Sequence, residues 1–69
     1  MHPVYTLYRW DDVTEAWQHR GTFTTSRGRE NAHYAVEMER ISDTGPLRLL
    51  KDGDVLIEDD PATYGMQTA

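Results

Sequence analysis

The sequence "PLRLLKDGDVLIEDD", residues 46–60, decides the fold. Asp52 and Gly53 suit a two-residue turn with positive φ at both central positions, and apolar runs flank the pair on both sides. A turn of this kind joins two antiparallel strands. It places two aliphatic pairs opposite each other, Leu49 with Leu56 and Leu50 with Val55. Both faces of this hairpin therefore carry aliphatic side chains.

The segment before this hairpin has the period of a helix. Residues 26–42, "SRGRENAHYAVEMERIS", place one apolar stripe on a helical surface and charged residues on another, as a helix over a sheet requires. The apolar stripe consists of Tyr34, Ala35, Met38 and Ile41. Thr25 or Ser26 can cap the first free N–H groups, and Gly45 followed by Pro46 ends the helix.

The first 25 residues have the composition of a second hairpin. Residues 3–10, "PVYTLYRW", and 16–25, "AWQHRGTFTT", are rich in β-branched and aromatic residues, with polar turn formers between them. If Trp10 pairs with Trp17, the face that carries both rings also includes Val4, Thr6, Tyr8, His19, Gly21 and Phe23. The other face then carries Tyr5, Leu7, Arg9, Gln18, Arg20 and Thr22. A one-residue slip of one strand would exchange these faces, and turn length alone does not exclude it.

The order of elements predicts an α+β fold. The chain reads β-β-α-β-β, and an antiparallel sheet of two hairpins with one helix packed on a face is the simplest way to bury these stripes. We expect residues 1–60 to form a single small domain, because 69 residues cannot supply two cores. Residues 61–69 lack periodicity and are expected to be a flexible C-terminal tail.

One helix leaves the second face of such a sheet uncovered. We expect Tyr5 and Leu7 on that face, with one aliphatic side of the second hairpin, as the interface of a two-fold homodimer. The alternative cover is the tail, through Tyr64 and Met66.

Composition limits the class of protein. The sequence has no cysteine, so it has no disulfides and no thiolate zinc sites, and its three histidines are scattered. No apolar run reaches the length of about 18 residues that a membrane helix needs. Because the N-terminus also lacks the features of a signal peptide, we expect a soluble cytoplasmic protein without membrane contact.

The sequence contains no recognisable catalytic pattern. It has no glycine-rich phosphate loop, no G-x-S-x-G elbow and no H-E-x-x-H pair. Carboxylates are adjacent or nearly so at three places, which are residues 11–12, 52–54 and 59–60. They are typical of turns and strand ends, and no calcium loop surrounds them. We therefore expect no enzymatic activity, no cofactor and no metal.

The formal charge of −5 favours a partner with a basic surface. We predict a small acidic protein-binding module, an adaptor or an inhibitor, of the kind by which phages and mobile elements block a host protein that handles nucleic acid. The residues expected to bind the partner lie at the two hairpin tips. They are Trp10, Asp11, Asp12 and Glu15 at one tip, and Asp52 and Asp54 at the other.

Two alternatives stay open. Arg20, Arg27 and Arg29 cluster near the end of the second predicted strand and could form a nucleic-acid surface beside the aromatic rings. Net acidity makes nucleic acid the less expected partner, because the protein repels phosphate backbones at long range. The other alternative is a structural subunit that assembles with itself.

Overall fold

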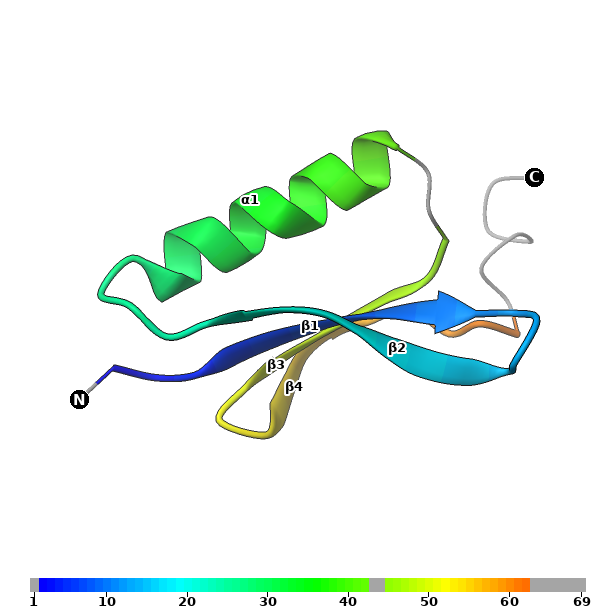
Figure 1. The fold of residues 1–69 in the computed structure, drawn as a ribbon, viewed down its shortest axis with the longest axis horizontal. Helices are drawn as coiled ribbons and strands as arrows, with labels where there is room; N and C mark the ends of the chain where they lie inside the picture. Colours follow the sequence, from blue (N-terminus) through cyan, green and yellow to red (C-terminus); the bar gives the residue numbers. More distant parts are fainter. Residues whose placement is uncertain (1, 43–44, 63–69) are drawn as a thin grey trace.

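The computed structural model describes residues 2–42 and 45–62, which form one sheet and one helix (Figure 1). The elements are β1 Tyr5–Asp11, β2 Ala16–Phe23, α1 Gly28–Ile41, β3 Leu47–Lys51 and β4 Asp54–Glu58. The strands follow the order β2-β1-β3-β4, and every neighbouring pair is antiparallel. The predicted α+β fold, two hairpins with one helix on a face, is confirmed.

The β3–β4 hairpin forms as its turn residues predict. Asp52 and Gly53 have the positive φ values that the turn needs, 50° and 88°. Asp52 also joins the hairpin to the start of β1. The N–H of Asp52 donates to the carbonyl oxygen of Val4 (2.8 Å), and the N–H of Val4 donates to Oδ1 of Asp52 (2.9 Å). Leu50 pairs with Val55 as predicted. Leu49, however, pairs with Ile57, because a bulge makes Leu56 an extra residue of β4.

The β1–β2 hairpin also contains a bulge. Trp10 pairs with Trp17 as predicted, and Tyr8 pairs with His19. Leu7 then pairs with Gly21, so one extra residue of β2 lies at position 20 and the two faces of the strand exchange beyond it. Phe23 consequently packs against the core instead of sharing a face with the two tryptophans. The predicted faces of Gly21, Thr22 and Phe23 are therefore wrong, because Gly21 pairs with Leu7 and Thr22 pairs with Thr6.

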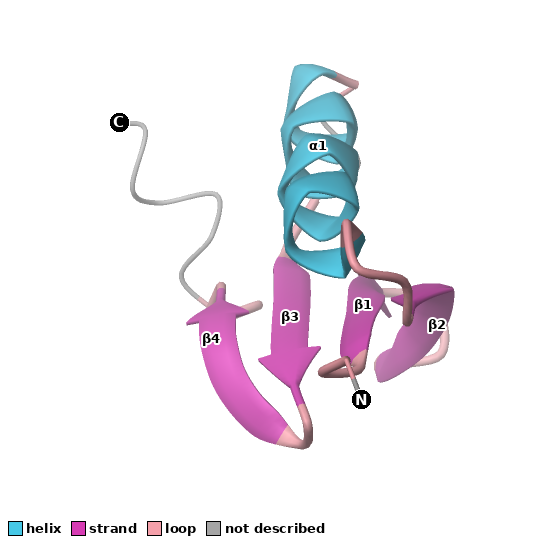
Figure 2. Ribbon diagram, turned by 90° about the vertical axis from the view of Figure 1, so that its left-hand side faces the viewer, coloured by secondary structure: helices cyan, strands magenta, loops and turns pink. Residues whose placement is uncertain are grey.

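The helix lies across one face of the sheet, in contact with β1, β2 and β3 (Figure 2). The buried core between the two layers consists of Tyr5, Leu7, Ala32, Val36, Leu47 and Leu49. The buried helix stripe is narrow and formed by Gly28, Ala32 and Val36. The stripe predicted from the sequence is wrong at Tyr34, Met38 and Ile41, which are exposed, whereas its fourth member, Ala35, packs against the core.

Small residues explain which side of the helix faces the sheet. A Cβ atom added to Gly28 would lie 3.1 Å from the carbonyl oxygen of Phe23 and 3.4 Å from the ring of Tyr5. A side chain at this position would have to push the backbone of Phe23 away by a few tenths of an ångström, so glycine favours the close approach at the first turn of α1. Because the buried stripe continues through the small side chain of Ala32, the helix can lie close to β1.

The residues predicted for a dimer interface lie in this core. Tyr5 and Leu7 are 4% and 2% exposed beneath the helix, so the prediction that they form the open face and a dimer interface is wrong. The cross-strand pairs that include Thr6, Tyr8 and Trp10 form the open face instead, because pairing partners share a face. We call this surface the open face; it includes Thr6, Tyr8, Trp10, Trp17, His19, Arg48, Leu50, Val55 and Glu58.

Candidate functional site

Aromatic rings gather on the open face toward the β1–β2 turn. The rings of Trp10 and Trp17 meet edge to face, with centroids 5.3 Å apart and an interplanar angle of 71°. The guanidinium of Arg48 lies over Trp17, 4.5 Å from the ring centroid, and is held there by Glu58. One face of Trp17 is therefore already occupied by a cation of the protein itself.

The β1–β2 turn is shaped by its own acidic residues. Asp11 accepts hydrogen bonds from the N–H of Val13 (3.0 Å) and from Nε2 of Gln18 (2.7 Å). Glu15, the last residue before β2, has a positive φ of 54°, so its backbone is in the left-handed region. Asp11 thus stabilises the turn, and Asp12 and Glu15 project from it into solvent.

A shallow hollow of about 400 Å³ lies beside Trp10. We call it the acidic hollow; it is lined by Trp10, Asp12, Glu15, Asp60, Pro61 and Ala62. The structure thus brings together three of the predicted partner-binding residues and adds Asp60. No Lys or Arg of the described residues lines the hollow. An aromatic ring beside three carboxylates is an environment that favours a cation.

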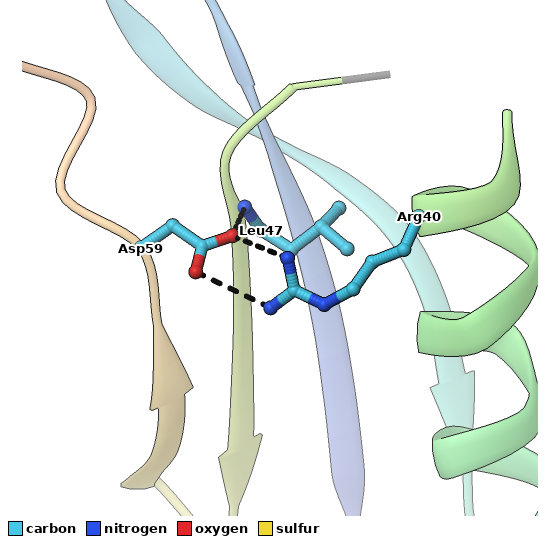
Figure 3. Close-up of polar contacts among 3 residues, drawn as sticks. All are labelled: Arg40, Leu47 and Asp59. Carbon is cyan, nitrogen blue, oxygen red and sulfur yellow. Dashed lines mark hydrogen bonds and ion pairs between the residues drawn. The ribbon is translucent and has the colours of Figure 1, made fainter. Parts of the chain in front are cut away.

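The segment that carries Asp60 is fixed by the residue before it (Figure 3). Asp59 accepts two parallel hydrogen bonds from Arg40 of α1, at 3.1 and 3.2 Å. It also accepts one from the N–H of Leu47 (3.0 Å), and its own N–H donates to the carbonyl oxygen of Leu47 (2.9 Å). Ala62 then closes a turn through its N–H to Oδ1 of Asp60 (2.9 Å). Residues 61 and 62 thus form part of the hollow, and residues 63–69, with Tyr64 and Met66, lie outside the described residues.

The other predicted tip lies at the far end of the sheet. Lys51 pairs with Tyr5 at the start of β1, whereas Asp12 follows the end of β1 (Figure 1). Seven strand residues separate these ends, a distance of about 20 Å. Asp52 and Asp54 therefore do not join the acidic hollow, and the carboxylate of Asp52 bonds to Val4.

The three candidate nucleic-acid residues are not brought together. Arg20 makes an ion pair with Glu39 at 3.1 Å and lines a hollow between α1 and β2. Arg29 lines a different hollow, together with residues of β3 and β4. Arg27 is exposed at the N-terminal cap of α1. Arg20 and Arg29 thus line different hollows, and Arg27 lines neither of these two.

The described residues contain no group of three or more His, Asp or Glu side chains placed to hold a metal ion. Within residues 2–42 and 45–62, the helix is too short and too polar to span a membrane. Comparisons of the chain with protein-family models, with curated proteins and with solved structures gave no match.

Sequence reasoning did not find two residues of this region, Asp60 and Arg48. Asp60 reaches Trp10, fifty positions earlier in the chain, only because β3 pairs with β1. Arg48 reaches Trp17 by the same route, through its pairing with Tyr8. Neither contact can be predicted from the neighbouring sequence. Both depend on the pairing of β1 with β3, which neither hairpin turn specifies.

Proposed function

We propose that the protein is a non-enzymatic protein-binding module, an adaptor or inhibitor, which receives a Lys or Arg side chain of a basic partner in the acidic hollow. The observation that carries the proposal is the ring of Trp10 placed beside Asp12, Glu15 and Asp60. A guanidinium or ammonium group can lie against such a ring while its N–H groups donate to the surrounding carboxylates.

The geometry favours a projecting side chain as the ligand. The hollow is shallow and lies at one end of the molecule, so a single long side chain can enter it from a convex partner. Exposed carboxylates contribute mainly to the rate of association and to selectivity, and the aromatic ring contributes apolar contact. The net charge of −5 acts in the same direction by attracting basic surfaces.

The test is a titration of the ¹⁵N-labelled protein with a short arginine-containing peptide and with the same peptide carrying glutamine in place of arginine. We expect chemical-shift changes at Trp10 and along the β1–β2 turn with the arginine peptide only. The double variant Asp12→Asn with Glu15→Gln should weaken binding about tenfold, because two charge-assisted contacts are lost.

Asp54→Asn is the matched control, since it removes one carboxylate at the other end of the sheet and changes nothing in the hollow. Equal binding of the glutamine peptide, or equal weakening by Asp54→Asn, would refute the proposal. Added salt should weaken binding of the arginine peptide less for the double variant than for the native protein.

Self-association is a second candidate function, supported by the composition of the open face. Tyr8, Leu50 and Val55 contribute apolar surface there, and Val55 is 56% exposed. Both edge strands, β2 and β4, contain a bulge, and bulged edges disfavour strand pairing between copies. Face-to-face packing of two sheets is therefore the favoured mode of assembly.

Sedimentation equilibrium tests this candidate. Val55→Glu should shift a dimer to monomer, whereas Met38→Glu, an equally polar change on the exposed side of α1, should leave the dimer intact. A native protein that is monomeric at all concentrations would exclude self-association as its function.

A further inference from the structure

A second hollow lies on the helix side of the sheet, at the end opposite the acidic hollow. It exists because α1 contacts β1, β2 and β3 and leaves the inner face of β4 uncovered (Figure 2). Its volume is about 400 Å³. We call it the basic cleft; it is lined by Tyr5, Arg29, His33, Lys51, Leu56 and Ile57.

The fold fixes the positions of the nitrogen-bearing side chains in this cleft. Lys51 pairs directly with Tyr5, so the two side chains share the face beneath the helix. The ring of Tyr5 lies under Gly28, and the next residue, Arg29, lines the cleft together with Tyr5 and Lys51. His33 follows Arg29 by four positions and lies one helical turn further along the same side. Three nitrogen-bearing groups from α1 and β3 thus converge on one hollow.

The two permanent cations of the cleft have no ion pair among residues 2–42 and 45–62. Arg20, Arg40 and Arg48 each make an ion pair with a carboxylate, whereas Arg29 and Lys51 make none in that part of the chain. Asp54 is the cross-strand neighbour of Lys51, yet the two side chains are not among the ion pairs of the described residues. No carboxylate lines the cleft in the described residues.

We propose that the basic cleft binds a phosphate monoester. The guanidinium of Arg29 can donate two parallel hydrogen bonds to phosphate oxygens, and the ammonium of Lys51 adds a compact charge. The imidazole of His33 supplies a further N–H donor. Leu56 and Ile57 form the apolar part of the lining, against which the carbon atoms next to the ester oxygen pack.

The form of the cleft favours a single phosphate over a nucleic-acid backbone. A polymer of phosphates requires a row of cations along its path. Here the cations lie around one bounded hollow, and the nearby β3–β4 turn carries Asp52 and Asp54. The phosphate proposal does not depend on the acidic hollow, which lies at the other end of β1.

The test is a titration of the ¹⁵N-labelled full-length protein with phosphoserine, with inorganic phosphate and with serine, at constant ionic strength. We expect saturable shifts around Arg29, His33 and Lys51 with both phosphates, tighter binding of the ester, and no shifts with serine. Arg29→Gln and Lys51→Gln should each weaken binding about tenfold, because each removes a charged hydrogen-bonding group.

Two matched variants sharpen the test. Arg27→Gln removes an exposed arginine at the same helix terminus, outside the cleft, and should leave the affinity unchanged. Asp54→Asn removes the carboxylate beside Lys51 and should tighten phosphate binding roughly threefold, since a nearby like charge no longer opposes the ligand. Thermal melting of each variant verifies that it is folded.

Three results would overturn the proposal. The first is the absence of saturable shifts up to about 10 mM phosphoserine, which leaves less than about 3 kcal/mol of binding free energy. The second is equal weakening by Arg27→Gln and Lys51→Gln. The third is tighter binding of a random oligonucleotide that depends on Arg27, which would assign the region to nucleic acid. Asp12→Asn is the control that separates this proposal from the one for the acidic hollow, because it alters only the acidic hollow.

Discussion

The two faces of the sheet are built from alternating residues of the same strands, yet they differ in composition. The covered face buries the ring of Tyr5 and the aliphatic side chains of β1 and β3, with Leu7, Leu47 and Leu49 at 2% exposure or less. The open face carries the larger rings, Trp10 and Trp17, which are only half buried. The difference shows that ring size did not decide which face is buried. The helix covers the face to which its narrow stripe of small residues fits, and aliphatic side chains fill that space at close packing.

The largest expected difference between the faces concerns leucines at adjacent positions. Leu49→Ala should lower the free energy of unfolding by about 2–5 kcal/mol, because it leaves a cavity beneath the helix. Leu50→Ala, on the open face, should cost about 1 kcal/mol or less. Urea unfolding followed by circular dichroism measures both. Equal losses would mean that the open face is covered as well as the core.

A smaller effect is expected where the helix meets the covered face. Gly28→Ala should lower the free energy of unfolding by about 1 kcal/mol, since the added methyl group crowds the carbonyl oxygen of Phe23. An alanine at an ordinary helical glycine would instead raise stability. Asn31→Ala, on the exposed side of the same helix, is the control and should raise stability by a few tenths of a kcal/mol. Thermal melting shows whether each substitution raises or lowers stability. A stabilising Gly28→Ala would show that the helix can move outward.

The loss of an ion pair should also lower the free energy of unfolding more on the covered face than on the open face. Asp59→Asn weakens the bonds to Arg40 and Leu47 that join α1 to β3, and it should cost about 1 kcal/mol after allowance for solvent screening. Glu58→Gln, which weakens the pair with Arg48 on the open face, should cost less than half as much. Chemical denaturation at low and high salt compares them. An equal or larger loss for Glu58→Gln would contradict the comparison.

The smallest effect concerns the cation over Trp17. Arg48→Met keeps the apolar stem and removes the charge, and it should cost about 0.5 kcal/mol. A double-mutant cycle with Trp17→Leu isolates the contribution of the contact. Tryptophan fluorescence of Arg48→Met should also change, because the guanidinium no longer lies on the ring. A coupling energy of zero would show that Arg48 acts only through Glu58.

Part of the candidate site could be predicted from local sequence. Trp10, Asp12 and Glu15 are predictable because they lie within six residues at the end of β1 and in the turn that follows, where chain neighbours are also neighbours in space. Asp60 and the basic cleft were not identified, because each depends on segments that are brought together by the pairing of β1 with β3. The predicted arginine cluster shows the reverse effect, since Arg20 and Arg29 are close in sequence but line different hollows.

The sequence by itself determined the elements, their order and the Asp52-Gly53 turn, because turn chemistry and residue period act over a few neighbouring residues. Tertiary structure decided the strand order, both bulges, the buried side of the helix and therefore which face of the sheet became the core. Those outcomes depend on how closely two layers can approach, as at Gly28 and Tyr5, and close approach is a property of the packed pair of surfaces rather than of either segment alone.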